Sequence, residues 1–333
     1  MRLLILGGTW FLGRALAELA IERGHIVTTF TRGRSGKDVR GTTPIRGDRT
    51  NSTDLAHLAT SGPWDAVVDT SGMTPAMVET AAACLAGAAN FYVFTSTVNV
   101  YRGWPTTPLD DASPLRTYTP EPPSGESGLD KYGREKVGCE QAVTSAFPDR
   151  AALLRPGVII GPYEYVGRVP WWLRRLARGG RVLAPGTAAW PIQPIDVRDV
   201  AAFALDTAER QRAGSYNLAA PIESATFGEL LDACQQATGS DARLEWVDHD
   251  FLIRHGVREW VELPLWRPYA GTWRLDAAHA RTAGLECRPL ATSVADTWKW
   301  LSDAGQLLDH ERAAELGIAP EREAELLAAW DAR

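Results

Sequence analysis

The chain has 333 residues, of which 45% are hydrophobic and 23% charged, and its formal net charge at pH 7 is −6. This acidic balance argues against a general nucleic-acid-binding surface, and no apolar run approaches the roughly 18 residues that a membrane span requires. The length suits a single large α/β unit or a larger unit with a smaller cap. Because the N-terminal apolar residues are needed for a strand rather than for a signal peptide, we expect a soluble, cytoplasmic protein.

The cysteine and histidine patterns give no metal site. Cys84, Cys139, Cys234 and Cys287 lie far apart with no C-x-x-C pair, so we expect lone thiols rather than zinc ligands or disulfides. His249 and His255 are six residues apart, which does not place them in a metal-binding register on one helical face.

The N-terminus carries a strand, a glycine turn and a helix in that order. Arg2–Leu6 (RLLIL) is almost wholly apolar, which predicts a strand buried on both faces of a parallel sheet. After the turn, apolar residues recur at helical spacing up to Gly24. This order places free backbone N–H groups and the positive end of a helix dipole at one point, which favours phosphate binding. The turn residues expected to contact a dinucleotide are Gly7, Thr9, Trp10, Phe11, Leu12 and Gly13.

The turn resembles the T-G-x-x-G-x-x-G motif of the short-chain dehydrogenase/reductase family, particularly its extended, NAD-dependent epimerase/dehydratase-like members. Gly7 and Gly13 match the first and last glycines, whereas Trp10 replaces the middle one. A bulky residue at this place also occurs in divergent relatives such as the chloroplast stem-loop-binding proteins. The resemblance implies a Rossmann-type doubly wound parallel sheet with a smaller, discontinuous α/β substrate-binding cap.

The end of the second predicted strand, His25–Thr31, bears on the coenzyme. Thr31 stands where NAD-binding folds usually carry an acid for the ribose 2′-OH, and Arg32 and Arg34 follow it. Arginine at this place accommodates a 2′-phosphate, so we predict NADP(H) in preference to NAD(H). A solvated basic turn is the alternative interpretation.

Three further segments resemble coenzyme contacts of the family. The resemblance implies that Asp48, with Arg49 beside it, approaches the adenine, although a helix-capping aspartate is nearly as good an interpretation. Ser71 and Gly72 form a small-residue turn that can approach the coenzyme closely, or that merely starts the next helix. The L-R-P-x-x-I-x-G-P match at 154–162 implies that backbone around Pro156 to Ile159, with Pro156 and Val158 as the named contacts, meets the nicotinamide.

A catalytic trio is predicted from two segments. The stretch Asn90–Tyr101 resembles the family's F-x-S-S-x-x-V-Y strand, which makes Thr97 the catalytic hydroxyl and places Asn99 near the substrate. Tyr132 and Lys136 form a Y-x-x-x-K pair on one helical face. The phenol would exchange a proton with a substrate oxygen, and the ammonium would lower its pKa. Ser96 is a neighbour that could be mistaken for Thr97.

The segment from Arg102 to Gly128 is polar and proline-rich, and no regular element fits it. An irregular connection of this length between two catalytic segments is typical of a substrate lid.

The C-terminal half is predicted to bind the substrate. We expect residues 1–160 and about 191–218 to form the dinucleotide-binding domain, and 161–190 and 219–333 to form the cap. Within a mostly solvated group of arginines, Arg168 is the better candidate for meeting an anionic substrate, and Trp171 is a candidate wall for an apolar pocket. Core packing is the competing interpretation of each tryptophan. Thr226 and Glu229 predict a capping box, and Glu311 to Arg333 predict one C-terminal surface helix.

These features support three hypotheses. The first is an NADP(H)-dependent carbonyl reductase or alcohol dehydrogenase acting on a small metabolite. The second is a sugar epimerase or dehydratase that retains its coenzyme, although Ile192 replaces the arginine with which nucleotide-sugar enzymes of the family grip a diphosphate. The third is a non-catalytic RNA-binding or regulatory relative, which the acidic charge disfavours. A homodimer is possible.

Overall fold

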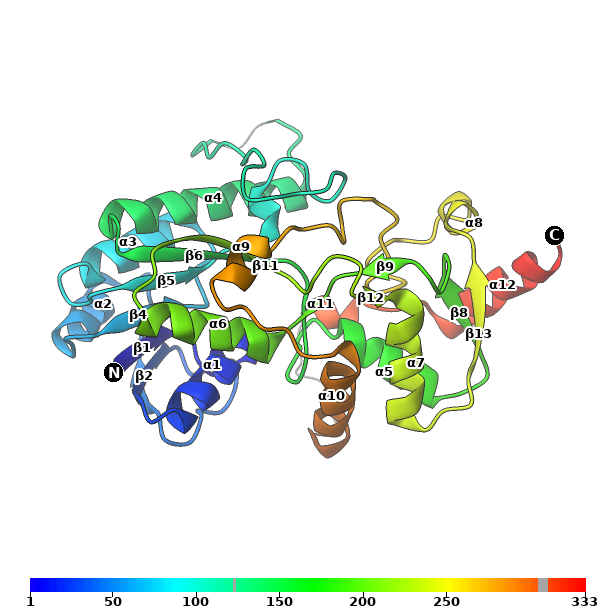
Figure 1. Cartoon of the computed structure of the whole chain (residues 1–333), viewed down its shortest axis with the longest axis horizontal. Coiled ribbons are helices and arrows are strands. Elements are labelled where there is room, and N and C mark those ends of the chain that lie inside the picture. The colour runs from blue at the N-terminus through cyan, green and yellow to red at the C-terminus, as the bar shows by residue number, and fades with distance from the viewer. Residues whose placement is uncertain (122–123, 305–310) are drawn as a thin grey trace.

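The computed structural model describes residues 1–121, 124–304 and 311–333. Its centre is a seven-stranded sheet with the order β11-β6-β5-β4-β1-β2-β3, in which each neighbouring pair is parallel (Figure 1). The strands are β1 (Arg2–Leu6), β2 (Ile26–Thr31), β3 (Thr43–Arg46), β4 (Ala66–Asp69), β5 (Tyr92–Thr95), β6 (Ala151–Pro156) and β11 (Gly214–Leu218). The predicted doubly wound parallel sheet is confirmed.

Helices cover both faces of this sheet. On one face lie α1 (Phe11–Glu22) and α6 (Val197–Glu209), and on the other lie α2 (Ser52–Thr60), α3 (Pro75–Leu85) and α4 (Gly128–Ala146). Strand β1 is buried between them, with Leu3, Leu4 and Ile5 wholly inaccessible to solvent. Side chains of a strand alternate between faces, so Leu3 and Ile5 join one hydrophobic core and Leu4 the other. The apolar N-terminal run is therefore the central strand that its sequence predicts.

The strand order reverses between β1 and β4. The chain leaves β1 toward β2 and β3 on one side, and returns to place β4, β5, β6 and β11 on the other. In open α/β sheets a ligand binds beyond the carboxyl ends of the strands at such a switch point. The glycine turn after β1 and the Ser71–Gly72 turn after β4 both lie at this edge.

The second lobe has a hydrophobic core of its own. It contains α5 (Arg168–Ala177), α7 (Phe227–Thr238), α8 (His249–Arg254), α10 (Leu290–Ala304) and α12 (Pro320–Asp331), with β8 (Arg181–Pro185) pairing in parallel with β13 (Arg243–Val247). Trp172 and Trp266, two of the chain's 13 tryptophans, are buried in this core.

Shorter elements connect the two lobes and complete them. They are η1 (Val98–Val100), β7 (Ile159–Ile160), β9 (Pro191–Ile192), β10 (Ile195–Asp196), β12 (Ala225–Thr226), α9 (Ala278–Thr282) and α11 (Glu311–Ala314). Between the lobes the chain crosses repeatedly: it leaves the sheet after β6, returns for α6 and β11, and then enters α7 (Figure 1).

Two local predictions have different outcomes. The capping box of α7 is confirmed, because the Thr226 hydroxyl accepts from the Glu229 N–H and the Glu229 carboxylate accepts from the Thr226 N–H. The single C-terminal helix is wrong, because α11 ends at Ala314 and a new helix, α12, begins at Pro320. Proline is well suited to the first turn of a helix but not to its interior, and this accounts for the break.

Among the described residues, no helix is both long enough and apolar enough to cross a membrane.

Candidate active site

The glycine turn after β1 is tight because its glycines touch neighbouring chain. Gly7 and Gly8 have φ angles of +113° and +107°, a region that side chains rarely adopt. A Cβ atom on Gly8 would lie 2.6 Å from Cγ2 of Thr29, and one on Gly13 would lie 2.6 Å from the Gly8 backbone nitrogen. Only glycine fits at these positions, so the start of α1 can approach β1 closely and leave its N–H groups at the sheet edge.

Trp10 occupies an extended position just before α1. Its ring centroid lies 4.6 Å from that of Tyr165, which belongs to the segment leading into α5. Phe11 and Leu12 start the helix with buried side chains, and the Thr9 hydroxyl hydrogen-bonds that of Ser35 at 3.2 Å. The residue in place of the middle glycine thus packs against the segment that leads into α5.

The basic turn after β2 is exposed. Thr31 accepts hydrogen bonds from the Gly33 N–H and from the Arg46 guanidinium, so its hydroxyl is held within the turn. Arg32 and Arg34 lie on the surface beside it. The backbone and hydroxyl of Thr50 donate to Asp48 and lower the pKa of this carboxyl, and the charges of Arg32 and Arg34 lower it further.

Arg49 has an internal role that the sequence did not reveal. Its Nη1 and Nη2 atoms each lie 2.7 Å from an oxygen of Asp69, at the end of β4, and the Tyr92 hydroxyl donates to the same carboxylate at 2.9 Å. Asp69 is fully buried and Arg49 is 8% exposed. The positive charge and the hydrogen bonds of Arg49 oppose the cost of burying Asp69 and hold its pKa below the usual range. Two nitrogens of Arg49 thus take part in an internal ion pair, and its contact with a coenzyme stays a prediction.

This ion pair fixes the turn after β4. The Arg49 Nη1 also donates to Oγ of Ser71 at 3.1 Å, and the Ser71 hydroxyl donates to the Leu6 carbonyl at 3.0 Å. At Gly72, a Cβ atom would lie 2.6 Å from Cγ2 of Val78 and 2.7 Å from Cε2 of Phe94. The small residues at 71 and 72 therefore bring the turn against β1 and α3.

Lys136 joins α4 to the ends of two strands. Its Nζ donates to the Gly72 carbonyl at 2.9 Å and to the Thr95 carbonyl at 2.6 Å, and it lies 4.1 Å from the centroid of the Phe94 ring. The side chain is 3% exposed, and this burial lowers the pKa of the ammonium to about 8. At neutral pH the ammonium is therefore still mostly protonated, although it is buried.

The turn carrying Thr97 and Asn99 packs directly against α4. Thr97 caps η1, and its hydroxyl oxygen accepts from the Asn99 backbone at 3.2 Å and from its side-chain amide at 2.9 Å. A Cβ atom on Gly133 would lie 2.1 Å from the Asn99 carbonyl oxygen. Gly133 thus allows the helix to touch the turn at the position next to Tyr132, whose side chain is partly exposed.

The proline-rich segment contains no helix or long strand in its described part, as predicted, but it is anchored at several points. Arg116 donates to the Asn99 carbonyl at 2.9 Å and to the Trp104 carbonyl at 3.4 Å, and it pairs with Asp130 at 2.5 Å. Arg134 pairs with Glu126 at 2.8 Å and donates to the Thr119 carbonyl. The segment is therefore held over η1 and the start of α4. Residues 122–123 lie outside the described part.

The residues predicted to contact the nicotinamide or the substrate lie at the end of β6, just after it, and in α5. Pro156 ends β6, and the Val158 carbonyl accepts from the Ile195 N–H at 2.9 Å. Arg168 pairs with the fully buried Glu164 at 2.7 Å and donates to the Ile159 carbonyl at 3.1 Å, so two of its nitrogens already have partners. Trp171 packs edge-on against Trp172 and lies directly under Gly317. Arg168 and Trp171 therefore make contacts within the chain, and their contact with a substrate stays a prediction.

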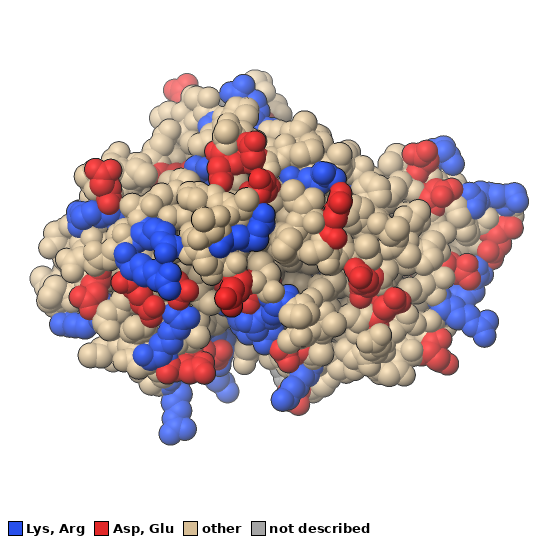
Figure 2. All heavy atoms as spheres, viewed as in Figure 1, with Lys and Arg blue, Asp and Glu red and all other residues tan. Residues whose placement is uncertain are grey.

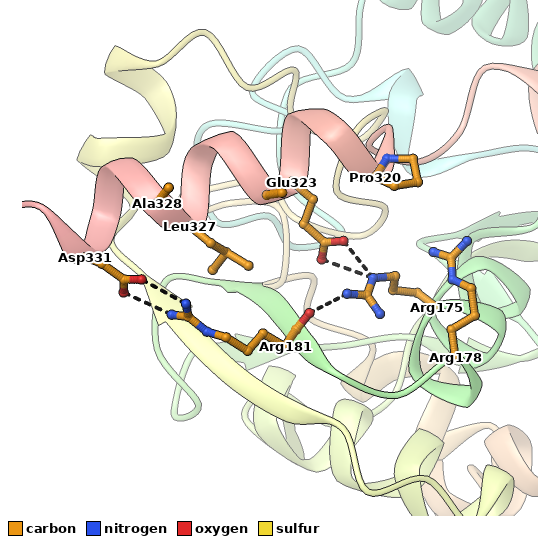
Figure 3. A pocket seen from close by; sticks show the side chains of 9 residues that line it. Arg175, Arg178, Arg181, Pro320, Glu323, Leu327, Ala328 and Asp331 are labelled. Carbon is orange, nitrogen blue, oxygen red and sulfur yellow. Dashed lines mark hydrogen bonds and ion pairs between the residues drawn. The ribbon is translucent and has the colours of Figure 1, made fainter.

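A groove of about 470 Å³ lies elsewhere, between α5, β8 and α12 (Figure 3). Its arginines mostly face acids of α12: Arg175 pairs with Glu323 at 2.8 Å and Arg181 with Asp331 at 2.8 Å. Arg175 is buried, which corrects the expectation of a solvated helix position. The Arg175–Glu323 pair is buried and the Arg181–Asp331 pair is exposed, and both lie at the opposite end of the molecule from α4 (Figure 1).

No group of three His, Cys, Asp or Glu residues within the described ranges could hold a metal ion. All four cysteines are free thiols.

Comparison with protein-family models gives one match. The NAD dependent epimerase/dehydratase family model covers residues 3–219. Solved structures share the fold over nearly the whole chain: the Bordetella bronchiseptica enzyme WbmH in complex with NAD+ has a TM-score of 0.70 at 19% identity, covering 92% of this chain and 99% of that one. A UDP-glucose 4-epimerase has a TM-score of 0.70 at 15% identity, covering 93% of this chain and all of that one.

Two curated proteins are similar in sequence. One is the chloroplast stem-loop binding protein of 41 kDa b of Arabidopsis thaliana, 26% identical over 255 residues, which are 72% of this chain and 63% of that protein. The other is the 2-alkyl-3-oxoalkanoate reductase of Stenotrophomonas maltophilia, 31% identical over 209 residues, which are 56% of this chain and 58% of that protein. The matches thus span about three fifths of each curated relative.

Proposed function

The chain belongs to the NAD dependent epimerase/dehydratase family, and from that premise we propose that it is an NADP(H)-dependent oxidoreductase. It interconverts an alcohol and a carbonyl group in a small metabolite, with Thr97, Tyr132 and Lys136 as its catalytic residues. The observation that carries this proposal is the placement of Lys136, which joins the helix of Tyr132 to the turns after β4 and β5.

The residues at the sheet edge fit a dinucleotide. Gly7, Gly8 and Gly13 form a turn so tight that a Cβ atom on any of them would strike neighbouring protein atoms. This turn lies at the N-terminus of α1, where backbone N–H groups favour phosphate. We assign the remaining coenzyme contacts as follows: Thr9, Trp10, Phe11 and Leu12 at this turn, Asp48, Ser71 and Gly72 beside the adenosine, and Pro156 and Val158 beside the nicotinamide. A bound nicotinamide coenzyme supplies or accepts the hydride.

Each of the three proposed catalytic residues has a separate role in proton transfer. A free phenol has a pKa near 10 and is a poor acid or base at neutral pH. The ammonium of Lys136 favours the phenolate and so brings Tyr132 nearer to the working pH. During reduction Tyr132 gives its proton to the substrate oxygen, and during oxidation it removes the hydroxyl proton. The Thr97 oxygen already accepts two hydrogen bonds from Asn99, which leaves its own proton available for the substrate oxygen.

The coenzyme preference follows from the turn after β2. Thr31 offers no carboxylate to a ribose 2′-OH, whereas Arg32 and Arg34 are exposed and able to pair with a 2′-phosphate. We therefore favour NADP(H) over NAD(H). Fluorescence titration of the purified protein with NADPH and NADH measures this preference directly.

The reaction is tested with Tyr132→Phe. In a screen of small ketones and 3-oxo acids with NADPH, the wild-type protein should oxidise the coenzyme stoichiometrically, and Tyr132→Phe should lose about two to four orders of magnitude in kcat, the usual contribution of a general acid. Coenzyme affinity should stay within about twofold, because the phenol is lost without a change of charge. Full activity of Tyr132→Phe would contradict the proposed role.

An epimerase or dehydratase that retains its coenzyme is the second candidate, and membership of the family favours it. Both reactions use the same three residues, but only the first consumes NADPH. Ile192 is buried where a diphosphate-binding arginine would be needed, so a nucleotide-diphosphate sugar is a poorer substrate for this chain. Substrate turnover with no net change in absorbance at 340 nm would select the second candidate.

A further inference from the structure

The ammonium of Lys136 is buried among neutral hydrogen-bond acceptors. Its Nζ donates to the carbonyl oxygens of Gly72 and Thr95, and the side chain is 3% exposed. Backbone carbonyls attract a proton donor but carry no net charge, whereas burial favours the uncharged amine. A negative charge near such a lysine is what keeps its proton on. The source of that charge therefore bears on whether Lys136 can assist Tyr132.

Asp69 supplies a negative charge that is itself fixed in place. Its carboxylate accepts from Nη1 and Nη2 of Arg49, from the Tyr92 hydroxyl and from the Ser71 backbone N–H, which lies 3.0 Å from Oδ1. Burial raises the pKa of such a group, but these donors outweigh burial and hold the pKa of Asp69 below its usual range. The carboxylate is therefore ionised although it is fully buried.

The Ser71–Gly72 turn joins this carboxylate to the Lys136 ammonium. The N–H of Ser71 donates to Asp69, and the carbonyl of Gly72 accepts from Lys136. A Cβ atom on Gly72 would lie 3.0 Å from Oδ2 of Asp69, so the carboxylate and the ammonium contact the same short turn from two directions. Hydrogen bonds in a chain polarise one another, and opposite charges at its two ends polarise it in the same sense.

Two other titratable groups near Lys136 lie on its own helix, α4. Burial raises the pKa of the Cys139 thiol to about 12, so this group carries no charge near pH 8. The charge of Glu140 also favours the protonated lysine, but both of its oxygens accept from Arg155, at 3.0 and 2.7 Å. Asp69 differs from both groups because it alone of the three contacts the turn that accepts from Lys136.

We propose that Asp69 is a positioning residue, whose fixed carboxylate acts through the Ser71–Gly72 turn to hold the Lys136 ammonium in place and charged on the helix of Tyr132. The charge of Arg49 opposes that of Lys136, but its hydrogen bonds keep the carboxylate ionised and orient it. This inference rests on the proposed function, because it explains how the ammonium assigned to catalysis keeps its proton. A pH limit of the reaction then depends on a fully buried acid.

Lysine-selective NMR measures this effect without turnover. The chain has four lysines, so the spectrum of protein labelled with carbon-13 at lysine Cε is simple. Lys136→Met identifies the Lys136 signal as the one that disappears, since the other three lysines, Lys37, Lys131 and Lys299, are unchanged and exposed. The full chain is titrated through the region around pH 8, where the wild-type Lys136 should lose its proton.

Asp69→Asn should lower the pKa of Lys136 by about one unit or more, the usual effect of losing a nearby opposite charge, because only the positive charge of Arg49 then remains. Asp69→Asn/Arg49→Gln removes both charges and should give a pKa between that of Asp69→Asn and that of the wild type, since Asp69 affects Lys136 more than Arg49 does. The double variant leaves no unpaired buried arginine, so it keeps the test open if Asp69→Asn does not fold. Thermal unfolding verifies the fold of each variant.

Glu140→Gln is the matched control. It also removes the acid of a buried arginine pair, but this acid does not contact the Ser71–Gly72 turn, so the pKa of Lys136 should fall less than in Asp69→Asn. An equal or larger fall in Glu140→Gln would overturn the inference. So would a wild-type pKa of Lys136 in Asp69→Asn, or in the double variant if only that one folds.

The two proposals fail separately. With NADPH and a small ketone that the wild type reduces, the alkaline limit of kcat in Asp69→Asn should move to lower pH by the same amount as the pKa of Lys136, a change that loss of structure alone would not produce. A pKa that falls as expected in a protein that reduces no carbonyl compound would overturn the proposed function alone. Reduction by the wild type together with an unchanged Lys136 pKa in Asp69→Asn would overturn the role of Asp69 alone.

Discussion

Burial of the Lys136 ammonium affects both its pKa and the stability of the protein. Its ammonium is almost wholly removed from water, donates to two backbone carbonyls and has a pKa lowered to about 8. In the unfolded chain the same group titrates near pH 10.4. At pH 7 both states are protonated, so the charge that we propose assists Tyr132 is present but lowers the stability of the folded protein.

This difference predicts the pH dependence of stability. Between about pH 8 and 10.4 the unfolded chain binds one more proton at Lys136 than the folded protein, so the free energy of unfolding should rise with pH in this window. Urea unfolding of the wild-type protein and of Lys136→Met from pH 7 to 10 isolates the contribution of Lys136 to the free energy of unfolding. All other groups titrate alike in the two proteins, so their contributions cancel. The wild type should gain stability relative to the variant as the pH rises. Parallel pH profiles would show that the lysine is not desolvated.

The ion pair of Arg49 is an example of a residue contact that sequence motifs do not predict. The residues of the predicted catalytic trio and of the glycine turn could be chosen from motifs, because the spacing within each motif is local. The partner of Arg49 could not, because Asp69 lies 20 residues away and meets it only when β4 is placed beside β1. An acid at the end of the otherwise apolar strand AVVD was the one available signal.

At the scale of elements, the contact between α4 and η1 determines where Tyr132 lies relative to Thr97. Gly133 leaves no room for a side chain against the Asn99 carbonyl oxygen, so the distance between the two elements depends on that glycine. Gly128, at the start of the same helix, has nothing within 4 Å of its would-be Cβ atom. The helix therefore offers a matched pair of positions.

We predict that Gly133→Ala separates the helix from the turn and lowers kcat by about 100-fold, the scale expected when a catalytic group is displaced by about 1 Å. It should also destabilise the protein by about 1–3 kcal/mol through overpacking. Gly128→Ala should leave kcat unchanged and raise stability by up to about 1 kcal/mol, because alanine favours helix. Steady-state kinetics and urea unfolding distinguish the two. Equal kinetics in both variants would mean that the close contact does not position Tyr132.

The elements themselves were largely predictable, and their exceptions have physical causes. The central strands and their helices follow from short apolar runs and helical periodicity, which are local properties. The proline-rich segment was correctly assigned no regular element in its described part, but its anchoring by Arg116 and Arg134 depends on tertiary contacts. The prediction of a single helix from Glu311 to Arg333 was wrong. The residues around Pro320 favour a helix, but the proline itself begins a new one.

For the whole molecule, α12 fastens the end of the chain to the second lobe. Glu323 accepts from Arg175 at 2.8 Å and from the Leu183 N–H at 3.0 Å, and both charged side chains are buried (Figure 3). Elsewhere charged side chains of both signs are scattered over the visible surface, where single pairs contribute little (Figure 2). The buried pair is therefore the electrostatic contact of α12 with the largest effect on stability.

Glu323→Leu should lower the free energy of unfolding by about 3–5 kcal/mol, because it leaves the Arg175 charge buried without its acid. Glu325→Leu is the control: this side chain is 71% exposed and lies 4.0 Å from Arg322, so its loss should change stability by about 0.5 kcal/mol or less. Thermal and urea unfolding compare the two. Similar effects of both changes would mean that α12 is held by apolar contacts alone.

The tilted contact between the rings of Trp10 and Tyr165 affects how two ligands influence each other. One ring belongs to the turn that we assign to the pyrophosphate, and the other to the segment that leads into the cap. A dinucleotide that shifts the indole must also shift Tyr165, and thermodynamic reciprocity then requires that a compound held by the cap alters the dinucleotide's affinity by the same factor. Trp10→Gly would remove this coupling, so the binding free energies of the dinucleotide and of the compound held by the cap would become additive.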